Sequence, residues 1–390
     1  MRKKFFGHAL GAAVAAALVS AACASNSPAP ELTDVTSYYV RADGDDRKNA
    51  GTSEDAPFKT LARAVKAAVK TQVKTITVIG TLVESVTIKN ADSTVRGIES
   101  DPDAEVKTVY INWSLDEHDP DELLIAGKPN TSTGERAVLI PAKKAKYALR
   151  IMSSTVRLEH IEISGLNVPK KAQGNVSAVI VDGGNLTLAR GADITKNVCY
   201  GRAGISVSAG VVIMRDDAEI SYNEGGNYAG LHLSNGSIGI MLDNARITGN
   251  KALGDGGGIA LSGSSLIMRD SSAVSDNSAG DSGGGIITFT NAKRGLTSEI
   301  AMSDTAVIRG NTAAKRGGGV FLQDRLIILD NAAITGNTSA EYGGGVWIVG
   351  GGAAVIREPD TVIKNNSAPH TPDINLALNV PAVSDVLTSP

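Results

Sequence analysis

One phrase recurs through the second half of this chain and restricts the folds open to it. An aliphatic residue is followed three positions later by asparagine, and six positions after that by three glycines, as in ITGNKALGDGGGIAL (247–261), IRGNTAAKRGGGVFL (308–322) and ITGNTSAEYGGGVWI (334–348). The asparagines are Asn197, Asn223, Asn250, Asn277, Asn311, Asn337 and Asn366, separated by 26, 27, 27, 34, 26 and 29 residues. A repeat of this length predicts a solenoid, in which each repeat stacks on the next.

The residues around each asparagine form columns with the spacing of short β-strands. Apolar residues two apart follow the glycines, as at Ile259 and Leu261, and such pairs share one face of a strand. A helical period does not fit them. Two further columns precede the asparagines by three and by nine positions, and we predict that both line the inside of the coils: Ile194, Ile220, Ile247, Val274, Ile308, Ile334 and Ile363, then Leu188, Met214, Met241, Met268, Met302 and Ile328.

The asparagines and glycines are suited to the corners where each coil turns. Identical corners stack about 4.8 Å apart, the spacing of neighbouring strands. An asparagine amide both donates and accepts hydrogen bonds, so a column of asparagines can bond from coil to coil. A run of glycines bends the chain without side chains. We therefore assign both features to the structure and not to chemistry; the glycine runs lack the Lys-Ser/Thr pair of a phosphate-binding loop.

Composition agrees with a solenoid whose core is aliphatic. Aromatic residues make up only 4% of the 390 residues, while glycine accounts for 43 of them. A formal net charge of −3 gives no electrostatic reason to expect a nucleic acid partner.

The N-terminus has the pattern of an export signal. Arg2, Lys3 and Lys4 precede a short apolar run, which is too short for a comfortable transmembrane helix. The segment LVSAACASN, with small residues before Cys23, resembles a bacterial lipobox, which implies cleavage before Cys23 and lipid attachment to it. We predict a signal peptide at 1–22, a lipid anchor and tether at 23–36, and an exported protein held by its lipid to an outer membrane or cell surface. The alternative is ordinary secretion with cleavage near Ala22.

The residues that follow the tether predict a cap. Leu61, Ala64, Val65 and Ala68 have helical spacing, after a helix start at 55–57 (Asp-Ala-Pro). The stretch GDDRKNAGTSEDAPFKTLARA resembles the opening of pectate-lyase-like right-handed β-helix proteins, where a helix covers the first coil. We predict an N-terminal cap at 37–72, a right-handed parallel β-helix at 73–375, and a C-terminal tail or cap at 376–390. The fold class is all-β, and the stretch at about 101–146 is read as insertion loops.

The spacing of the repeat also resembles that of polymorphic outer membrane proteins, a family of bacterial surface β-helices with adhesin-like members. The resemblance covers about 185–366. It implies a surface-exposed, non-catalytic protein that binds a carbohydrate or a host or matrix protein.

An enzyme is the main alternative, because polysaccharide lyases and glycoside hydrolases are built on the same fold. Pectate lyases need clustered carboxylates for calcium and an arginine, and polygalacturonases need aspartates near a histidine. No such motif is present, and His118, His160, His232 and His370 are scattered along the chain. Fold alone carries no activity. We therefore expect no catalysis; a structural envelope protein without a ligand is a third alternative.

Two groups of acidic residues are candidate cation sites. An aspartate column stands seven residues before five of the asparagines: Asp216, Asp243, Asp270, Asp304 and Asp330. Stacked carboxylates repel unless they accept hydrogen bonds at a corner or share a cation such as Ca²⁺. We favour the hydrogen-bonded corner and expect no cofactor, with calcium as the alternative. The second group is Asp116, Glu117, Asp119, Asp121 and Glu122 beside His118, which fits no metal-binding motif.

The strand after the glycines offers a candidate binding face. Its first and third residues point inward, so its second residue should point outward. Ile287, Phe321 and Trp347 would then form one apolar strip, with Tyr342 at its edge, which can stack on sugar rings or hold a protein partner. The alternative is that the C-terminal segment at 373–380 folds back over the strip. The outward positions are Ser206, His232, Ala260, Ile287, Phe321 and Trp347.

Overall fold

The computed structural model describes residues 35–89, 122–131, 133–168, 176–202, 204–349, 353–358 and 361–374. The predicted signal peptide, Cys23, most of the tether and the segment at 376–390 lie outside these residues. Within the described part of the chain, no helix is both long enough and apolar enough to cross a membrane.

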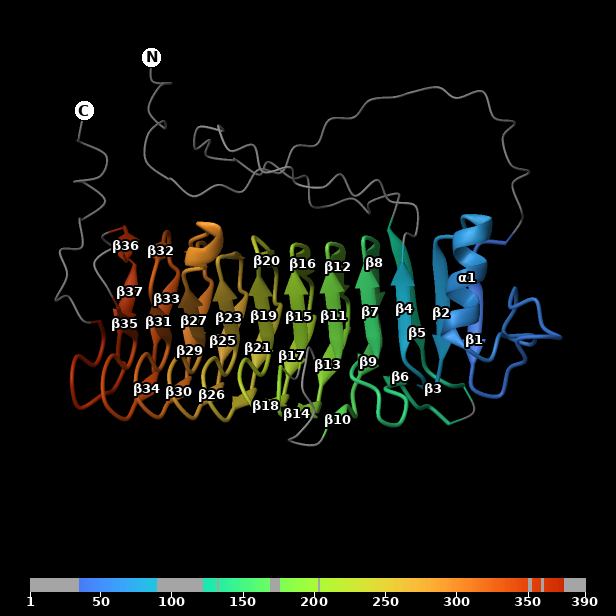
Figure 1. Ribbon diagram of the computed structural model, residues 1–390, viewed down its shortest axis with the longest axis horizontal. Helices are drawn as coiled ribbons and strands as arrows, with labels where there is room; N and C mark the ends of the chain where they lie inside the picture. Colours follow the sequence, from blue (N-terminus) through green and yellow to red (C-terminus); the bar gives the residue numbers. More distant parts are fainter. Residues whose placement is uncertain are drawn as a thin grey trace, which may run out of the picture.

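Thirty-seven strands, all paired in parallel, form four sheets of 11, 10, 9 and 7 strands among the described residues. Figure 1 shows the coils stacked along one axis, with the N-terminal coils at one end and the C-terminal coils at the other. The 11-stranded sheet contains, in stacking order, β1 (Tyr38–Arg41), β2 (Thr75–Ile79), β5 (Leu123–Lys128), β8 (Thr155–Glu159), β12 (Asn185–Ala189), β16 (Val211–Met214), β20 (Ile238–Met241), β24 (Ser265–Met268), β28 (Glu299–Met302), β32 (Arg325–Ile328) and β36 (Ala354–Arg357).

The other three sheets repeat the same order of coils. The 10-stranded sheet contains β3 (Thr81–Val83), β6 (Ala137–Ile140), β9 (Ile161–Ile163), β13 (Asp193–Thr195), β17 (Glu219–Ser221), β21 (Arg246–Thr248), β25 (Ala273–Ser275), β29 (Val307–Arg309), β33 (Ala333–Thr335) and β37 (Val362–Lys364). The nine-stranded sheet contains β4 (Val86–Lys89), β7 (Leu149–Met152), β11 (Val179–Asp182), β15 (Ile205–Ser208), β19 (Leu231–Ser234), β23 (Ile259–Ser262), β27 (Ile286–Phe289), β31 (Val320–Leu322) and β35 (Val346–Ile348). The seven-stranded sheet contains β10 (Asn167–Val168), β14 (Val198–Cys199), β18 (Glu224–Gly225), β22 (Lys251–Ala252), β26 (Ser278–Ala279), β30 (Thr312–Ala313) and β34 (Thr338–Ser339).

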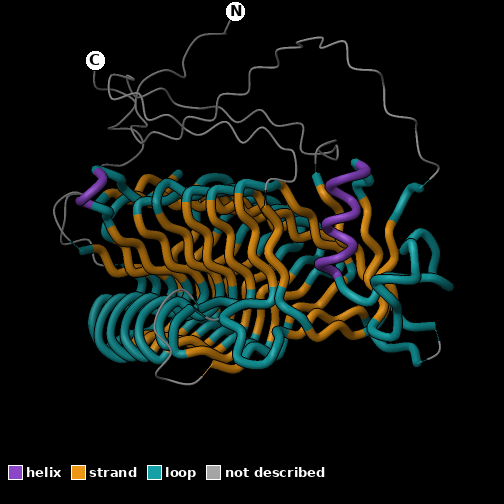
Figure 2. The backbone as a smooth tube through the Cα atoms, turned by 45° about the vertical axis from the view of Figure 1, so that its right-hand side comes forward, coloured by secondary structure: helices purple, strands orange, loops and turns teal. Residues whose placement is uncertain are grey.

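The register of the strands confirms the predicted inner columns. Met214 pairs with Met241, Met241 with Met268, and Ile220 with Ile247, and all are buried. One continuous cluster of buried apolar side chains runs through the whole stack. Figure 2 shows how the stacked strands form flat sheets joined by stacked corner loops. The fold is therefore a parallel β-helix, as predicted.

The asparagine column is buried and hydrogen-bonded from coil to coil. Asn250 donates from both its backbone N–H and its side-chain Nδ2 to Oδ1 of Asn277, at 2.9 and 3.0 Å. Its Nδ2 also donates to the carbonyl of Ile220 at 2.9 Å. The same bonds recur along the column, which ends at Asp373, whose Oδ1 accepts from the backbone N–H and Nδ2 of Asn366. This ladder was predicted from the sequence.

The glycine triplets allow the corners to approach one another. The first glycine of each triplet has a left-handed backbone, with φ of 68° at Gly256 and 69° at Gly283. The third lies against the next coil: a Cβ on Gly258 would stand 2.5 Å from the carbonyl oxygen of Gly285. A side chain there would clash with backbone.

The N-terminal cap forms as predicted, with a different start. Helix α1 (Leu61–Thr71) buries Leu61, Ala64, Val65 and Ala68 at the N-terminal end of the core (Figure 1). Its N-cap is Thr60, whose side chain accepts the N–H of Arg63, so the helix begins later than the segment at 55–57. Thr60 is the stronger start because its hydroxyl satisfies an N–H that the first turn leaves open.

Two parts of the predicted division along the chain differ from the structure. Strand β1 lies within the predicted cap, yet it pairs with β2 and so begins the 11-stranded sheet. The stretch at about 101–146 is not all insertion: β5 pairs with β2 and β8, and β6 pairs with β3 and β9. A short 3-10 helix (Ala292–Arg294) accounts for the one long interval between asparagines.

Candidate functional site

The outward side of the nine-stranded sheet carries a different residue on each coil. The predicted outward positions are direct neighbours in the register: Ser206 pairs with His232, His232 with Ala260, Ala260 with Ile287, Ile287 with Phe321, and Phe321 with Trp347. We call this side of the sheet the outward face. Along the stack these positions change from polar to apolar and aromatic residues, in the direction that the sequence predicted.

The first four of these positions are buried, which corrects the expectation that they meet solvent. Ile287, predicted as part of the binding face, is only 1% exposed. The corner backbone covers it, because a Cβ on Gly283 would lie 2.6 Å from the Cβ of Ile287, and one on Gly256 would lie 3.0 Å from its Cγ2. Ile287 is therefore not available to a ligand and lies beneath the surface of this face. Phe321, Trp347 and Tyr342 are half-buried.

We call Phe321, Tyr342 and Trp347, with Arg316 and His370, the aromatic strip. The rings of Tyr342 and Trp347 lie 5.1 Å apart, and the ring of His370 stacks on Tyr342 at 4.9 Å. The guanidinium of Arg316 lies 5.9 Å from the rings of both Tyr342 and Trp347. Arg316, Tyr342 and His370 are corner residues of three successive coils, since Arg316 bridges to Tyr342 and Tyr342 to His370, and the first two lie against the ring of Trp347. Sequence reasoning found the three aromatic residues but missed Arg316 and His370.

The described residues of the segment predicted as a cover, Asp373 and Ile374, pair with the start of β35 and continue the stack. Ile374 forms a parallel bridge with Val346 and packs against the end of the core. Val346 donates its N–H to the carbonyl of Asp373. These two residues therefore extend the stack by one further coil. The rest of the segment predicted as a cover, 375–380, lies outside the described residues.

A second polar and aromatic cluster lies upstream on the same face and was not predicted. The ring of Tyr228 stacks on His232 at 5.0 Å and lies 6.0 Å from Phe289, with Arg202 5.9 Å from the Tyr228 ring. Tyr228 has φ of 58°, in the position that Gly256 occupies on the next coil. A left-handed tyrosine costs about 1 kcal/mol or more. A tyrosine replacing the first glycine of the triplet was the signal that could have revealed it.

Burial controls the charges in this cluster. It lowers the pKa of His232 to about 3, with a smaller contribution from the positive charge of Arg202, and it raises the pKa of Tyr228. His232 is 3% exposed, and its Nδ1 has no hydrogen-bond partner. The imidazole is therefore neutral near pH 7 and shielded by the tyrosine ring, which makes it a poor general base in this arrangement.

The aspartate column forms a ladder of its own. Oδ2 of Asp243, Asp270 and Asp304 accepts the backbone N–H of Asp216, Asp243 and Asp270, at 2.9, 3.0 and 3.2 Å. Asp330 accepts in the same way from Asp304. The carboxylates accept backbone N–H groups at a corner, as we favoured, but each N–H comes from the neighbouring coil and not from the local turn that an Asx-type corner would use. All five aspartates have left-handed backbones, with φ between 53° and 57°.

The acidic group at 116–121 lies outside the described residues, so its predicted cation site has no structural description; Glu122 is buried just before β5. Among the residues that are described, no three His, Cys, Asp or Glu side chains gather in a way that could hold a metal ion.

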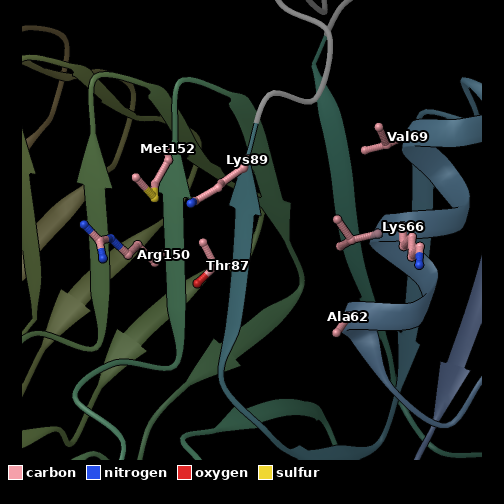
Figure 3. Close-up of a pocket in the computed structure, with 8 residues that line it drawn as sticks. Ala62, Lys66, Val69, Thr87, Lys89, Arg150 and Met152 are labelled. Atoms are coloured by element: carbon pink, nitrogen blue, oxygen red, sulfur yellow. The ribbon is translucent and has the colours of Figure 1, made fainter.

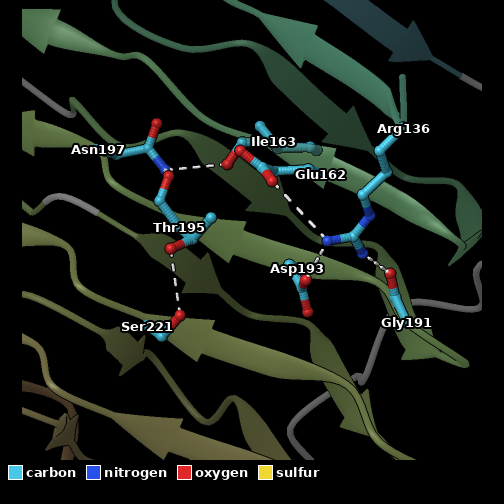
Figure 4. Close-up of polar contacts among 8 residues, drawn as sticks. All are labelled: Arg136, Glu162, Ile163, Gly191, Asp193, Thr195, Asn197 and Ser221. Carbon is cyan, nitrogen blue, oxygen red and sulfur yellow. Dashed lines mark hydrogen bonds and ion pairs between the residues drawn. The ribbon is translucent and has the colours of Figure 1, made fainter. Parts of the chain in front are cut away.

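Figure 4 shows an ion-pair cluster on the 10-stranded sheet that ties three coils together. Arg136 donates to the carboxylate of Asp193 and to the carbonyl of Gly191, and its guanidinium lies 3.8 Å from Glu162. Burial raises the pKa of Asp193, and Arg136 opposes that rise. Nη1 and Nη2 of Arg136 are both directed to acceptors within the fold, so we assign the cluster a structural role.

The 11-stranded sheet carries an outward aliphatic column that sequence reasoning missed. Ile213 pairs with Ile240, Ile240 with Ile267, and Ile327 with Ile356. The signal was present ten residues before six of the seven asparagines, since Thr187 holds that position before Asn197. From Ile213 to Ile356 the column is apolar and offers no group that would select a ligand.

Comparison with known proteins supports the fold and adds no activity. Residues 177–368 match the family model described as a right handed beta helix region. No curated protein and no solved structure gives a significant match to the chain. The repeat register and this match together identify the chain as a right-handed parallel β-helix, and helix α1 near the N-terminus is compatible with the predicted cap.

Proposed function

We propose that this protein is a non-catalytic, surface-exposed binding protein of adhesin-like character, and that the aromatic strip takes a carbohydrate. The single observation that carries the proposal is the grouping of Phe321, Tyr342 and Trp347 on adjacent coils, half-exposed on a sheet face. Solvent alone would favour polar residues there. Flat sugar faces stack on aromatic rings, and Arg316 and His370 supply donors at the edge.

The proposal is tested by placing the full chain on an array of immobilised glycans and matrix proteins. We expect binding to glycans, and about a tenfold loss on Trp347→Ala or Tyr342→Ala, since an aromatic contact contributes about 1.5 kcal/mol. Tyr200→Ala is the matched control, because Tyr200 is a 53% exposed tyrosine beside the seven-stranded sheet. Binding only to matrix proteins would replace the carbohydrate by a protein partner. An equal loss of glycan binding in Trp347→Ala, Tyr342→Ala and Tyr200→Ala would show that the aromatic strip is not the binding site.

The rival proposal is a polysaccharide lyase or hydrolase on the same fold. It is tested with uronic acid polymers in the presence of calcium, where a lyase would create an ultraviolet-absorbing double bond. We expect no absorbance change. Turnover that disappears in His232→Gln but persists in Trp347→Ala would favour the enzyme and place its chemistry at the upstream cluster.

We further propose that lipid on Cys23 holds the protein to a membrane. The lipobox-like sequence supports this, and Cys199, the other cysteine, is buried with its pKa raised to about 11 by burial. Cys23→Ser should move the protein from the membrane fraction to the soluble fraction. Unchanged membrane retention would overturn the anchor and leave the glycan proposal intact.

A further inference from the structure

The opposite end of the outward face, beside the capping helix, contains a pocket of about 550 Å³ (Figure 3). One wall is the exposed side of α1, where Ala62, Lys66 and Val69 lie one turn apart. The other wall is the outward side of β4 and β7. There Thr87 and Lys89 pair in register with Arg150 and Met152. The volume is in the range of small-molecule sites.

Three cationic side chains line the pocket in the described part of the chain, and only one of them, Arg150, is paired there with an acidic residue. Arg150 is already paired, because its Nε and Nη2 donate to Oδ2 of Asp182 at 2.8 and 2.6 Å. Lys66 and Lys89 are exposed, and neither forms an ion pair or hydrogen bond with another residue of the described chain. The N-terminus of α1 is occupied by the carboxylate of Glu84, which accepts the N–H groups of Leu61 and Ala62. The unpaired side-chain charges of the pocket lining are therefore those of Lys66 and Lys89, and both are positive.

Between the charges the lining is aliphatic. Val65 is almost fully buried between the walls, Val69 is exposed enough to meet a ligand, and Met152 is half-buried and flexible enough to adapt to one. Among the described residues, none of those that line the pocket is aromatic. The lining thus lacks the stacking surface that sugars use, and differs in chemistry from the aromatic strip.

We propose that this pocket binds a small amphiphilic anion, in which a carboxylate or phosphate head is carried on an aliphatic body. Lys66 and Lys89 would hold the head through charge-assisted hydrogen bonds, while Val65, Val69 and Met152 would contact the body. The same chemistry is available from a free amphiphile and from the headgroup region of an anionic lipid. The proposal is independent of the glycan site at the other end of the face.

Calorimetry of the full chain with octanoate tests the proposal, with acetate as the head without a body and octanamide as the body without a charge. We expect octanoate to bind at least about tenfold more tightly than either control. Lys66→Gln and Lys89→Gln should each weaken binding about tenfold, while Lys70→Gln should not. Lys70 is exposed on the same helix and does not line the pocket. Equal binding of acetate and octanoate, or insensitivity to both lysines, would overturn the proposal.

Vesicles separate the two sources of the ligand. If the natural ligand is a lipid headgroup, the full chain carrying Cys23→Ser should bind phosphatidylglycerol vesicles, octanoate should compete, and phosphatidylcholine vesicles should not bind. If it is a free amphiphile, octanoate should bind and the vesicles should not compete with it. Absence of binding to octanoate and to anionic vesicles alike would refute the site.

Discussion

The buried asparagine column and the outward face of the nine-stranded sheet are built by the same coils, yet they differ in how closely the residues repeat. Asparagine occupies the column on seven successive coils, whereas the outward face passes from Ser206 through His232 and Ile287 to Trp347. A ladder of coil-to-coil hydrogen bonds needs one residue type throughout. A face with no such requirement can change its chemistry along the stack. A residue type that repeats on every coil therefore indicates a structural role. Positions whose residue type varies from coil to coil are where a ligand can be selected.

The sharpest test of this contrast is Asn277→Leu, which we expect to have the largest effect. The change removes the acceptor of the Asn250 N–H and Nδ2, and the donor to the carbonyl of Ile247. Because each unsatisfied buried group costs about 1–3 kcal/mol, the free energy of unfolding should fall by about 5 kcal/mol. Denaturant unfolding measures it. Asn185→Leu is the control, because Asn185 is outside the column and should lose less than about 1 kcal/mol. Comparable losses would mean that the column has no special role.

The contrast between the asparagine column and the outward face would be weaker if a residue of that face contributed to stability as a core residue does. His232 is the residue of the face that tests this. Its pKa of about 3 lies below the ordinary value of 6.5, so between these values the unfolded chain binds a proton that the folded chain does not. Its contribution to stability is complete above about pH 6.5 and is lost as the pH falls. Going from pH 7 to about pH 4.5 should remove about 3 kcal/mol. The difference between the parent and His232→Phe at the two pH values isolates this residue. An identical pH dependence in both would show that His232 is protonated in the fold.

The double change of Phe321 and Trp347 to alanine should have a smaller effect on stability. Both side chains are half-buried, so the pair should cost about 2 kcal/mol, well below the loss for one buried asparagine. Glycan binding, in contrast, should be abolished. Thermal unfolding and the glycan array, run on the same preparations, separate the two effects. A stability loss equal to that of Asn277→Leu would mean that another part of the chain covers the strip.

The smallest effect is expected at the aspartate ladder, which repeats like the asparagines but is more exposed. Asp270→Asn keeps an acceptor for the N–H of Asp243 and tolerates a left-handed backbone, so it should change the free energy of unfolding by less than about 0.5 kcal/mol. Asp270→Ala loses both properties and should cost about 1–2 kcal/mol. EDTA should leave the melting temperature unchanged. A lower melting temperature with EDTA, restored by calcium, would show that the carboxylates share a cation.

What the sequence could predict follows the same division. The Met and Ile columns and the asparagine ladder were accessible because a stacking coil repeats its residues at a nearly fixed interval. Strand β5 was missed because Leu123–Lys128 stands apart from the repeat. The burial of Ile287 depends on how the backbone of two neighbouring corners folds over it, which alternation along one strand does not reveal. The pocket joins residues 62–69 with residues 87–152, and no local pattern connects them.

The asparagine ladder also has an electrical direction. Every Oδ1 faces the N-terminal coil, and one N–H of each side-chain amide donates to the next residue of the ladder toward the C-terminal coil, while Nδ2 also donates back to a carbonyl of the preceding coil. The side-chain carbonyl groups therefore all point the same way, with the negative end of the column at Asn197. Each end meets a group of the right sign: the N–H of Leu166 donates to Asn197, and the carboxylate of Asp373 receives Asn366. A carboxylate has no proton to pass on, so the sequence of bonds stops there. Within the described residues, Asp373 therefore ends the side-chain amide ladder, because its carboxylate accepts from Asn366 and carries no side-chain N–H of its own.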